Sequence, residues 1–335
     1  PKQTKQIMIH PDFYSYKVKI VDKPFSAGGD AYYKQTAIIS FYNIKQQLLF
    51  SKDFGYISTD EIYDNIEKHN LVNLDYCYVR NFSFTTYRRI QVVDKFSSIK
   101  LKSISAQNAF FDSEYNIDFS YLIIDESVVN FENTCFANGD LKFSHTNFGN
   151  GDVNFSYALF RSSIVDFSNA IFGEGDVVFK NATFLDGFKN FQYTDFGVGP
   201  INFVNTDFGN GEVSFINSNF NEGDVSFKVA RFGTGKVDFH FAKFYGGDIS
   251  FERTSFGDGD VDFKTVEFGT GKVNFNRATF GNGNVVFEAS GADGRITFKK
   301  TSFGNGDLSF DLAEYENTEL NLEKAFFGEC NLSFF

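Results

Sequence analysis

The sequence has few residues of the types that usually carry chemistry. Its 335 residues include no tryptophan, one methionine, three cysteines and four histidines. The histidines lie far apart, without the spacing of metal ligands or of a base beside a nucleophile. The cysteines are odd in number and widely spaced, which excludes a paired disulfide framework and a zinc motif and predicts buried free thiols. They are Cys77, Cys135 and Cys330.

The sequence also lacks the patterns of catalytic and metal-binding loops. No G-x-S-x-G segment occurs, and no glycine-rich turn is followed by Lys-Ser or Lys-Thr. The segment Gly257–Asp262 carries aspartates at alternate positions, as a calcium loop does. However, Phe263 and Gly269 stand where an EF-hand requires glycine and an acid. We therefore expect no catalytic residue, no metal, no cofactor and no enzymatic activity.

Long apolar runs are missing as well. No run approaches the roughly 18 apolar residues that span a bilayer, and the N-terminus does not match a secretion signal. We therefore expect a soluble, cytoplasmic protein without membrane contact. The net charge is −12, with 15 Lys and Arg against 10 Asp and Glu in residues 1–110, and 16 against 33 in residues 111–335. Because phosphate contacts need clustered cations, this acidity argues against direct nucleic-acid binding and favours a basic protein partner.

Phenylalanine is the abundant residue, with 47 copies in a strict period. One series recurs every twelve residues from Phe136 to Phe280, and a second does so from Phe131 to Phe287. The consensus is F-G-x-G-x-V-x-F-x-x-[A/T]-x, and one residue is missing between Phe287 and Phe298. The alternating apolar positions in V-x-F and A-x-F predict two short strands per unit, joined by a tight two-residue corner and a longer Gly-rich corner. Such a period is typical of a solenoid.

Two coil sizes are compatible with this period. A coil of 12 residues has a perimeter of roughly 40 Å, which leaves little room for two Phe, one Val and one Ala per layer. A coil of 24 residues has a perimeter of roughly 80 Å and holds four Phe, two Val and two Ala. We therefore favour an all-β fold, a parallel β-helix with about 24 residues per coil.

The five-residue steps of the sequence read A-x-F-x-x, as in Ala170–Phe172. This resembles the pentapeptide-repeat family, with every second unit expanded by two residues at the G-x-G corner. The resemblance covers about two thirds of the chain, and it implies a right-handed β-helix of quadrilateral type. Some members of that family mimic DNA and occupy the basic DNA-binding saddle of type II topoisomerases, so the resemblance implies a DNA-mimic regulator as one alternative.

The part before the repeat is predicted to cap the solenoid. Strands are expected over Tyr14–Val21 and Ala37–Tyr42, and a helix over Thr59–His69, where Ser58 and Glu61 fit a capping box. The domain bounds that we expect are 1–73 for this small α+β cap, 74–118 for irregular first coils and 119–335 for the Phe-ladder solenoid.

Departures from the consensus are the best candidates for binding residues. Outward positions of residues 228–245 carry basic and aromatic side chains, and we predict a partner-binding patch there. Its residues are Lys228, Arg231, His240, Phe241, Lys243 and Tyr245. The sequence also stops inside the repeat, which predicts an uncapped apolar end and a homodimer formed end to end. The residues of this end are Phe326, Phe327, Leu332, Phe334 and Phe335.

These observations favour one function and leave three others open. The favoured function is a non-enzymatic β-solenoid scaffold that binds another macromolecule, most simply a protein, through its acidic rod surface. One alternative is the DNA-mimic regulator of a DNA-binding enzyme such as a type II topoisomerase. Another is a surface or adhesin-type structural protein. The last is an effector activity in the N-terminal segment, with the solenoid as its sensor.

Overall fold

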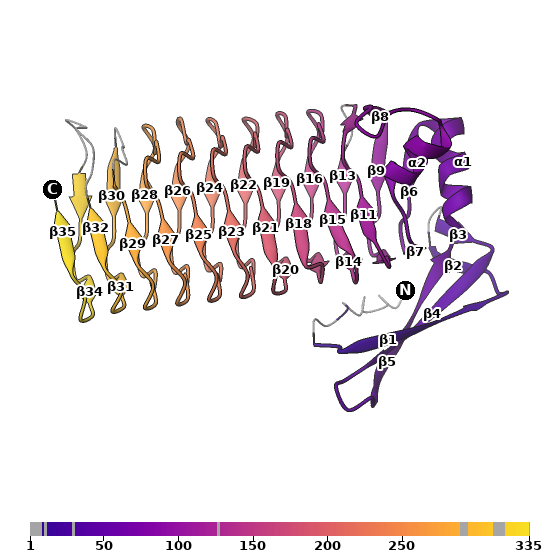
Figure 1. Ribbon diagram of the computed structural model, residues 1–335, viewed down its shortest axis with the longest axis horizontal. Helices are drawn as coiled ribbons and strands as arrows, with labels where there is room; N and C mark the ends of the chain where they lie inside the picture. Colours follow the sequence, from indigo (N-terminus) through magenta and orange to yellow (C-terminus); the bar gives the residue numbers. More distant parts are fainter. Residues whose placement is uncertain are drawn as a thin grey trace.

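The chain forms a rod of stacked coils with a cap at its N-terminal end (Figure 1). The structure is a computed structural model that describes residues 9, 12–28, 31–125, 128–288, 294–310 and 319–334. Strands of successive coils pair in parallel and in a constant register, as Val153 does with Val177 and Val177 with Ile201. The prediction of a β-solenoid with about 24 residues per coil and a small cap is thus confirmed.

Each coil has four sides, which we call walls 1 to 4 in chain order. Walls 1 and 3 are continuous parallel sheets built from the V-x-F segments. The strands of wall 1 are β6 (Leu71–Asn73), β9 (Ser103–Ser105), β13 (Val129–Asn130), β16 (Val153–Asn154), β19 (Val177–Val178), β22 (Ile201–Asn202), β24 (Val225–Ser226), β26 (Ile249–Ser250), β28 (Val273–Asn274), β30 (Arg295–Thr297) and β33 (Glu319–Asn321). Those of wall 3 are β11 (Asn116–Asp118), β15 (Asp140–Lys142), β18 (Ile164–Asp166), β21 (Phe188–Asn190), β23 (Val213–Ser214), β25 (Val237–Asp238), β27 (Val261–Asp262), β29 (Val285–Val286), β32 (Leu308–Phe310) and β35 (Leu332–Phe334).

Walls 2 and 4 are built from the A-x-F segments, and in many coils they pair through single bridges. Wall 2 includes β7 (Cys77–Arg80), β10 (Phe110–Asp112), β14 (Cys135–Phe136), β17 (Leu159–Phe160), β20 (Thr183–Phe184), β31 (Ser302–Phe303) and β34 (Phe326–Phe327). Wall 4 begins with β8 (Ile99–Leu101) and β12 (Leu122–Ile124). It continues through bridges that run from Ile123 with Asn147 to Lys243 with Glu267. Tight corners join wall 1 to 2 and wall 3 to 4, and wide corners join wall 2 to 3 and wall 4 to 1.

The core is a set of four phenylalanine columns, one behind each wall. Successive rings of a column stack face to face, as Phe155 and Phe179 do with centroids 4.9 Å apart and an interplanar angle of 8°. The columns of the opposite walls 1 and 3 meet edge to face, as Phe155 and Phe167 do with centroids 5.5 Å apart and an interplanar angle of 87°. The coil that lacks one residue is shorter by one, so Val273 pairs with Ile296. The rings of Phe275 and Phe298 nevertheless stack with centroids 4.7 Å apart. The ring columns therefore tolerate a coil of unequal length.

The tight corners explain the polar consensus of the V-x-F segments. The second corner residue is left-handed, with φ of 55° at Asn133 and 59° at Asn181, a conformation that asparagine adopts at low cost. The outward residue of the preceding strand turns the chain into this corner. For example, Asn154 Oδ1 accepts the Ser156 N–H at 2.8 Å, and Asp262 Oδ1 accepts the Lys264 N–H at 2.8 Å. Part of the acidity of the rod is therefore structural.

The wide corners stack glycine on glycine. A Cβ on Gly247 would collide with the backbone of Gly223 one coil earlier, whereas the same atom on Gly246 would meet nothing nearer than 3.8 Å. Carboxylates also bind across these corners, because Asp152 Oδ1 accepts the Asp176 N–H at 2.9 Å and Asp224 Oδ1 accepts the Asp248 N–H at 2.8 Å. An asparagine can take this role, since Asn284 Oδ1 accepts the Asp307 N–H at 2.9 Å.

The cap extends wall 2 and covers the rod there. Its antiparallel strands are β1 (Ser15–Val21), β4 (Gln35–Tyr42) and β5 (Leu48–Tyr56), followed by pairing of β5 with β7, while β2 (Phe25–Gly28) pairs with β3 (Ala31–Tyr33). Phe41 and Phe54 pack in one cluster with the outward side chains of Phe110, Cys135 and Leu159. This layer gives three coils of wall 2 an apolar cover.

Two helices complete the cap, α1 (Thr59–His69) and α2 (Phe84–Ile90). The predicted bounds of α1 are confirmed, and so is the capping box formed by Ser58 and Glu61. None of the helices in the described part of the chain is long and apolar enough to cross a membrane.

The residues predicted for the end of the rod lie in the last described coil. Phe326, Leu332 and Phe334 are exposed, and Phe327 is half-buried against the core. Phe335 lies outside the described residues. Self-association through this end stays a prediction, which light scattering would test.

Candidate functional site

The structure separates the residues of the predicted basic-aromatic patch. The stretch 228–245 covers most of one coil, so its residues face several directions. Lys228 lies in the tight corner before wall 2. Arg231 lies on wall 2, where its backbone forms isolated β-bridges with Asp207 and Ser255 of the neighbouring coils. His240 and Phe241 lie in the tight corner before wall 4, and Lys243 lies on wall 4. Tyr245 begins the wide corner that follows. Only His240, Phe241, Lys243 and Tyr245 therefore share one side of the rod, which is wall 4 with its two corners.

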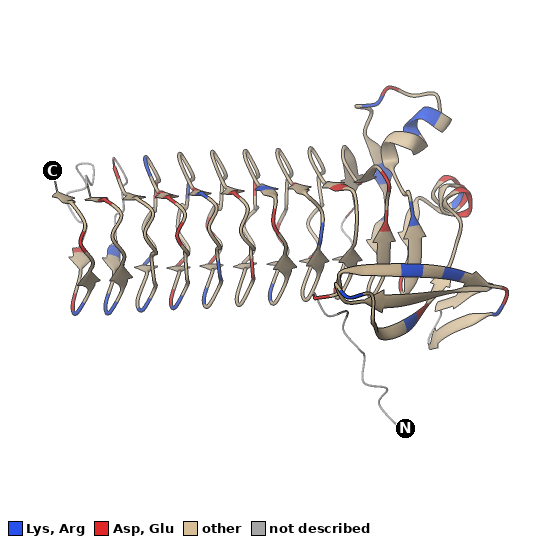
Figure 2. Ribbon diagram, turned by 60° about the horizontal axis from the view of Figure 1, so that its bottom comes forward, with Lys and Arg blue, Asp and Glu red and all other residues tan. Residues whose placement is uncertain are grey.

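The basic members of that predicted patch are paired with carboxylates of neighbouring coils. Lys228 Nζ lies 3.8 Å from Glu252, Arg231 Nη2 lies 2.6 Å from Asp207, and Lys243 Nζ lies 2.9 Å from Glu267. The imidazole of His240 packs edge-on against Phe241 at 4.1 Å. Such pairs mix the two signs of charge along the coils (Figure 2), so they do not create a basic patch.

Exposed apolar side chains gather on wall 4 and its two corners instead. Tyr193 and Phe241 occupy left-handed tight-corner positions, with φ of 57° and 59°, which asparagine fills at Asn169 and Asn217. A bulky residue is strained in this conformation, and backbone strain of this kind is concentrated at functional sites. We call five of these side chains the wall 4 surface, namely Ile171, Tyr193, Val198, Phe241 and Tyr245.

A row of carboxylates follows the wide corner between wall 4 and wall 1. We call it the acidic edge, and it comprises Asp152, Glu174, Asp176, Glu222, Asp224 and Asp248, all exposed. Within the described ranges, none of the six carboxylates has a cationic side-chain nitrogen of lysine, arginine or histidine within 4.0 Å. Val198 and Pro200 replace the acids in the middle coil. The acidic edge therefore presents carboxylates without ion-pair partners directly beside the wall 4 surface. Asp224 and Asp248 of this edge also line a hollow that Lys228 and Lys272 share.

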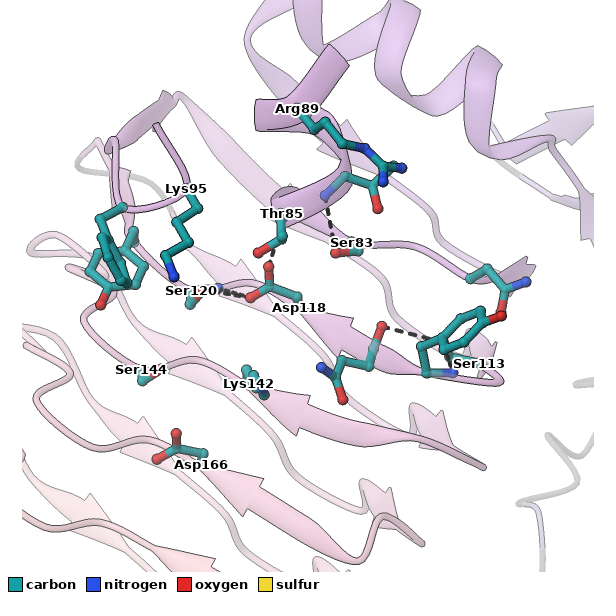
Figure 3. A pocket seen from close by; sticks show the side chains of 16 residues that line it. Ser83, Thr85, Arg89, Lys95, Ser113, Asp118, Ser120, Lys142, Ser144 and Asp166 are labelled. Atoms are coloured by element: carbon teal, nitrogen blue, oxygen red, sulfur yellow. Dashed lines mark hydrogen bonds between the residues drawn. The ribbon is translucent and has the colours of Figure 1, made fainter. Parts of the chain in front are cut away.

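A second candidate is a cleft between the cap and the first coils, which we call the cap cleft (Figure 3). Its volume is about 720 Å³. The outward side chains of three consecutive strands of wall 3 form its floor, namely Asp118, Lys142 and Asp166. Helix α2 covers it with Thr85 of its first turn and Arg89 of its last turn, and the loop after α2 adds Lys95 and Phe96. The sequence gives little sign of this site, because its walls come from the irregular coils.

Arg88 anchors the wall of the cap cleft from behind. Its side chain is fully buried and donates to the carbonyl oxygens of Ser97, Ser120 and Tyr121. Its Nη1 lies 3.8 Å from Asp118, whose carboxylate also accepts the Thr85 N–H at 2.7 Å. Burial lowers the pKa of the guanidinium, but an arginine keeps its charge. The charge of Asp118 is therefore balanced inside the protein.

Neither surface holds an arrangement typical of catalysis. Among the described residues no three His, Cys, Asp or Glu side chains are placed to hold a metal ion. Cys77 and Cys135 are buried as predicted, and burial raises the pKa of each thiol to about 12, so both are poor nucleophiles at neutral pH. Cys330 is half-buried.

Compared with known proteins, the chain matches no protein-family model and no curated sequence. The resemblance to pentapeptide-repeat proteins therefore rests on the residues of the repeat alone.

Proposed function

We propose that this protein is a non-enzymatic β-solenoid scaffold that binds a basic macromolecule, most simply a basic segment of another protein. The observation that carries the proposal is the acidic edge beside the wall 4 surface. Six exposed carboxylates without ion-pair partners among the described residues run over several coils beside five exposed apolar side chains.

The two parts of this surface have different physical roles. Tyr and Phe side chains that become buried at an interface supply much of its affinity, and Tyr193, Phe241 and Tyr245 are placed to do so. Uncompensated carboxylates raise the association rate of a basic partner and disfavour acidic ones. Because stacked coils hold all these groups in place, ordering the rod on binding costs little free energy.

DNA mimicry is a special form of this proposal, in which the partner is a DNA-binding groove. The row of carboxylates along the rod favours it, since successive coils repeat at about 4.8 Å. The missing acids at Val198 and Pro200 and the ion pairs on the other walls argue against a regular phosphate-like array. Competition with duplex DNA distinguishes the two forms.

The experiment uses substitutions that the repeat itself shows to be compatible with folding. Asp152→Asn, Asp176→Asn and Asp224→Asn together remove three charges of the acidic edge. Asparagine accepts the same backbone hydrogen bond elsewhere in the rod, as Asn284 does. Tyr193→Asn with Phe241→Asn removes two aromatic side chains and places asparagine in its preferred conformation. Tyr157→Asn, on the tight corner before wall 2, is the matched control.

Each variant is immobilised and compared with the wild type in pull-downs from cell lysate at low and high salt. We expect proteins that bind the wild type and the Tyr157→Asn control but bind neither the acidic edge variant nor the Tyr193→Asn, Phe241→Asn variant, with release at high salt, since exposed charges are screened. Release by duplex DNA would identify the mimic. Equal capture by all four proteins, or capture of nothing, would contradict the proposal.

A further inference from the structure

The cap cleft differs from the rod in the pairing of its cations. Seven lysines and arginines of the rod reach a carboxylate of a neighbouring coil; they are Lys228, Arg231, Lys236, Lys243, Lys264, Arg295 and Lys299. Other rod cations, such as Arg253 and Arg277, stand exposed on a convex corner. In the cap cleft Arg89, Lys95 and Lys142 line one cavity, and across the described residues no carboxylate oxygen lies within 4.0 Å of their charged groups.

The carboxylates of the cap cleft do not cancel this positive charge. Asp118 is buried, faces Arg88 and is saturated with hydrogen bonds from Thr85 and Ser120. Asp166 lies at the far end of the floor, where it accepts from the Asn190 side chain at 3.0 Å. The cleft as a whole therefore carries a positive excess. Arg89, Lys95 and Lys142 outnumber Asp166, the carboxylate of the lining that is not paired with Arg88, and a bound anion would offset this excess of positive charge.

The remaining lining groups of the cap cleft are mostly neutral hydrogen-bond donors. Hydroxyl-bearing residues surround the cations, and they are Ser83, Thr85, Thr86, Ser113, Ser120 and Ser144. One wall is aromatic, where Phe96 packs on Tyr121 with centroids 5.3 Å apart. Hydroxyl groups beside cations can donate to a ligand rich in oxygen acceptors, while the ring wall suits a carbon backbone.

The rim of the cap cleft is apolar and strained. The last residue of α2, Ile90, is exposed, and so are Val92, Val93 and Phe96 of the loop that follows, with Val92 90% exposed. Val92 also has φ of 56°, which is a genuine outlier for a β-branched residue. Val92 and Val93 line a hollow that shares Arg89 and Lys95 with the cap cleft. Exposed apolar side chains beside cations are suited to the edge of a phospholipid headgroup layer.

We propose that the cap cleft binds the phosphate of a phosphate monoester, held by Arg89, Lys95 and Lys142. A phosphate dianion matches three cations better than a carboxylate does, because it carries more charge and offers three acceptor oxygens. The volume of about 720 Å³ leaves room for the rest of the ester. The ester can be a soluble molecule or a lipid headgroup, and the apolar rim is what a lipid would contact.

The test measures binding of two probes to the full chain. The soluble probe is glycerol 3-phosphate, followed by calorimetry. The membrane probe is a vesicle of phosphatidylcholine with phosphatidic acid, which presents the same monoester, compared with pure phosphatidylcholine in a flotation assay. We expect at least one probe to bind. Glycerol 3-phosphate binding identifies a soluble source, and binding to phosphatidic acid vesicles alone identifies a lipid.

The variants compare equal changes of charge. Arg89→Gln, Lys95→Gln and Lys142→Gln together should weaken binding by more than about tenfold, since each removes a charge-assisted hydrogen bond. The control Lys228→Gln, Arg231→Gln and Lys243→Gln removes the same charge from the rod and should change binding by less than about twofold. Val92→Ser with Val93→Ser, which changes the rim and no lining residue of the cap cleft, should weaken only vesicle binding. Equal weakening by both triple variants, or no binding of either probe to the wild type, would overturn the proposal.

Discussion

Among the residues that the structure describes, the cap and the rod each bury one cation fully, and they surround it differently. In the cap, Arg88 is surrounded by three backbone carbonyl groups and faces the carboxylate of Asp118. In the rod, Lys189 occupies an inward position of wall 3, between Val165 and Val213 of the neighbouring coils. It is 1% exposed, and its Nζ has no hydrogen-bond partner among the described residues.

The difference follows from the two kinds of structure. An irregular region makes each contact once, so its loops can be arranged around a charged side chain. A repeat holds its backbone groups in coil-to-coil hydrogen bonds, as Lys189 N–H does with Glu212 O, and leaves no carbonyl free for an inward ammonium. Arg88 therefore holds the surrounding loops together through its hydrogen bonds. Lys189 instead places an ammonium group without a hydrogen-bond partner in a column of apolar side chains. Point substitutions test this contrast, beginning with the largest expected effect.

Arg88→Met should lower the free energy of unfolding by about 3–5 kcal/mol, because it leaves Asp118 buried without its counter-charge. Urea denaturation of the purified protein measures this change. Arg89→Met is the matched control, since Arg89 is exposed, and it should shift stability by less than about 0.5 kcal/mol. Similar small effects of both variants would show that Arg88 does not hold these loops together.

Lys189→Met should raise the free energy of unfolding by roughly 1–3 kcal/mol at neutral pH, because it replaces an unsatisfied buried group with an apolar one. The same denaturation experiment applies. Lys180→Met, at an exposed corner of the same rod, serves as the control and should have little effect. A loss of stability in Lys189→Met would mean that the ammonium has a partner in solution.

The stability gained by Lys189→Met should depend on pH. Burial lowers the pKa of the Lys189 ammonium from 10.5 to about 8. Below about pH 8 this amine is protonated in both the folded and the unfolded state, so the whole cost of burying its charge is present. From pH 8 to 10.5 only the unfolded state keeps the proton, so the wild type gains stability as the pH rises. Denaturation at pH 7 and pH 9.5 should show a smaller difference at the higher pH, and a constant difference would contradict this account.

Val229→Asn should raise the free energy of unfolding by about 1 kcal/mol, the smallest effect in this series. Val229 lies in a tight corner with φ of 59°, where Asn205 and Asn181 occupy the equivalent positions one and two coils earlier. Thermal unfolding of the variant beside Asn205→Val, which should lose a similar amount, measures the effect in both directions. Equal stabilities of the three proteins would show that these corners relax without strain.

The regular part of the molecule was accessible from its sequence, and the irregular part was not. The twelve-residue period and the volume of four phenylalanines predict the coil, and Ser58 with Glu61 predicts the start of α1. The left-handed tight corners were missed, although asparagine at positions 133, 181 and 205 is a readable signal for them. The burial of Lys189 could also have been predicted, because this lysine occupies a position where the repeat has valine.

The candidate sites were harder to predict for a physical reason. The predicted patch joined residues that are close in sequence, whereas the path of the chain around one coil places Lys228 and Phe241 in different corners. Arg89 and Lys142 lie far apart in the sequence, and only the fold of the first coils brings them to one cavity. No period in the sequence connects them, although Lys142 does depart from the Asn, Asp or Ser found at outward positions.

The two half-coils of the repeat have a consequence for how such a chain changes in evolution. Each coil contains the twelve-residue unit twice, so walls 1 and 3 are built from equivalent segments, as are walls 2 and 4. Duplication of a whole coil lengthens the rod by one layer, about 4.8 Å, and leaves every later residue on its own side. Duplication of a single unit turns all later residues to the opposite side and keeps the core intact. Single duplications can therefore move a binding surface around the rod without disturbing the fold.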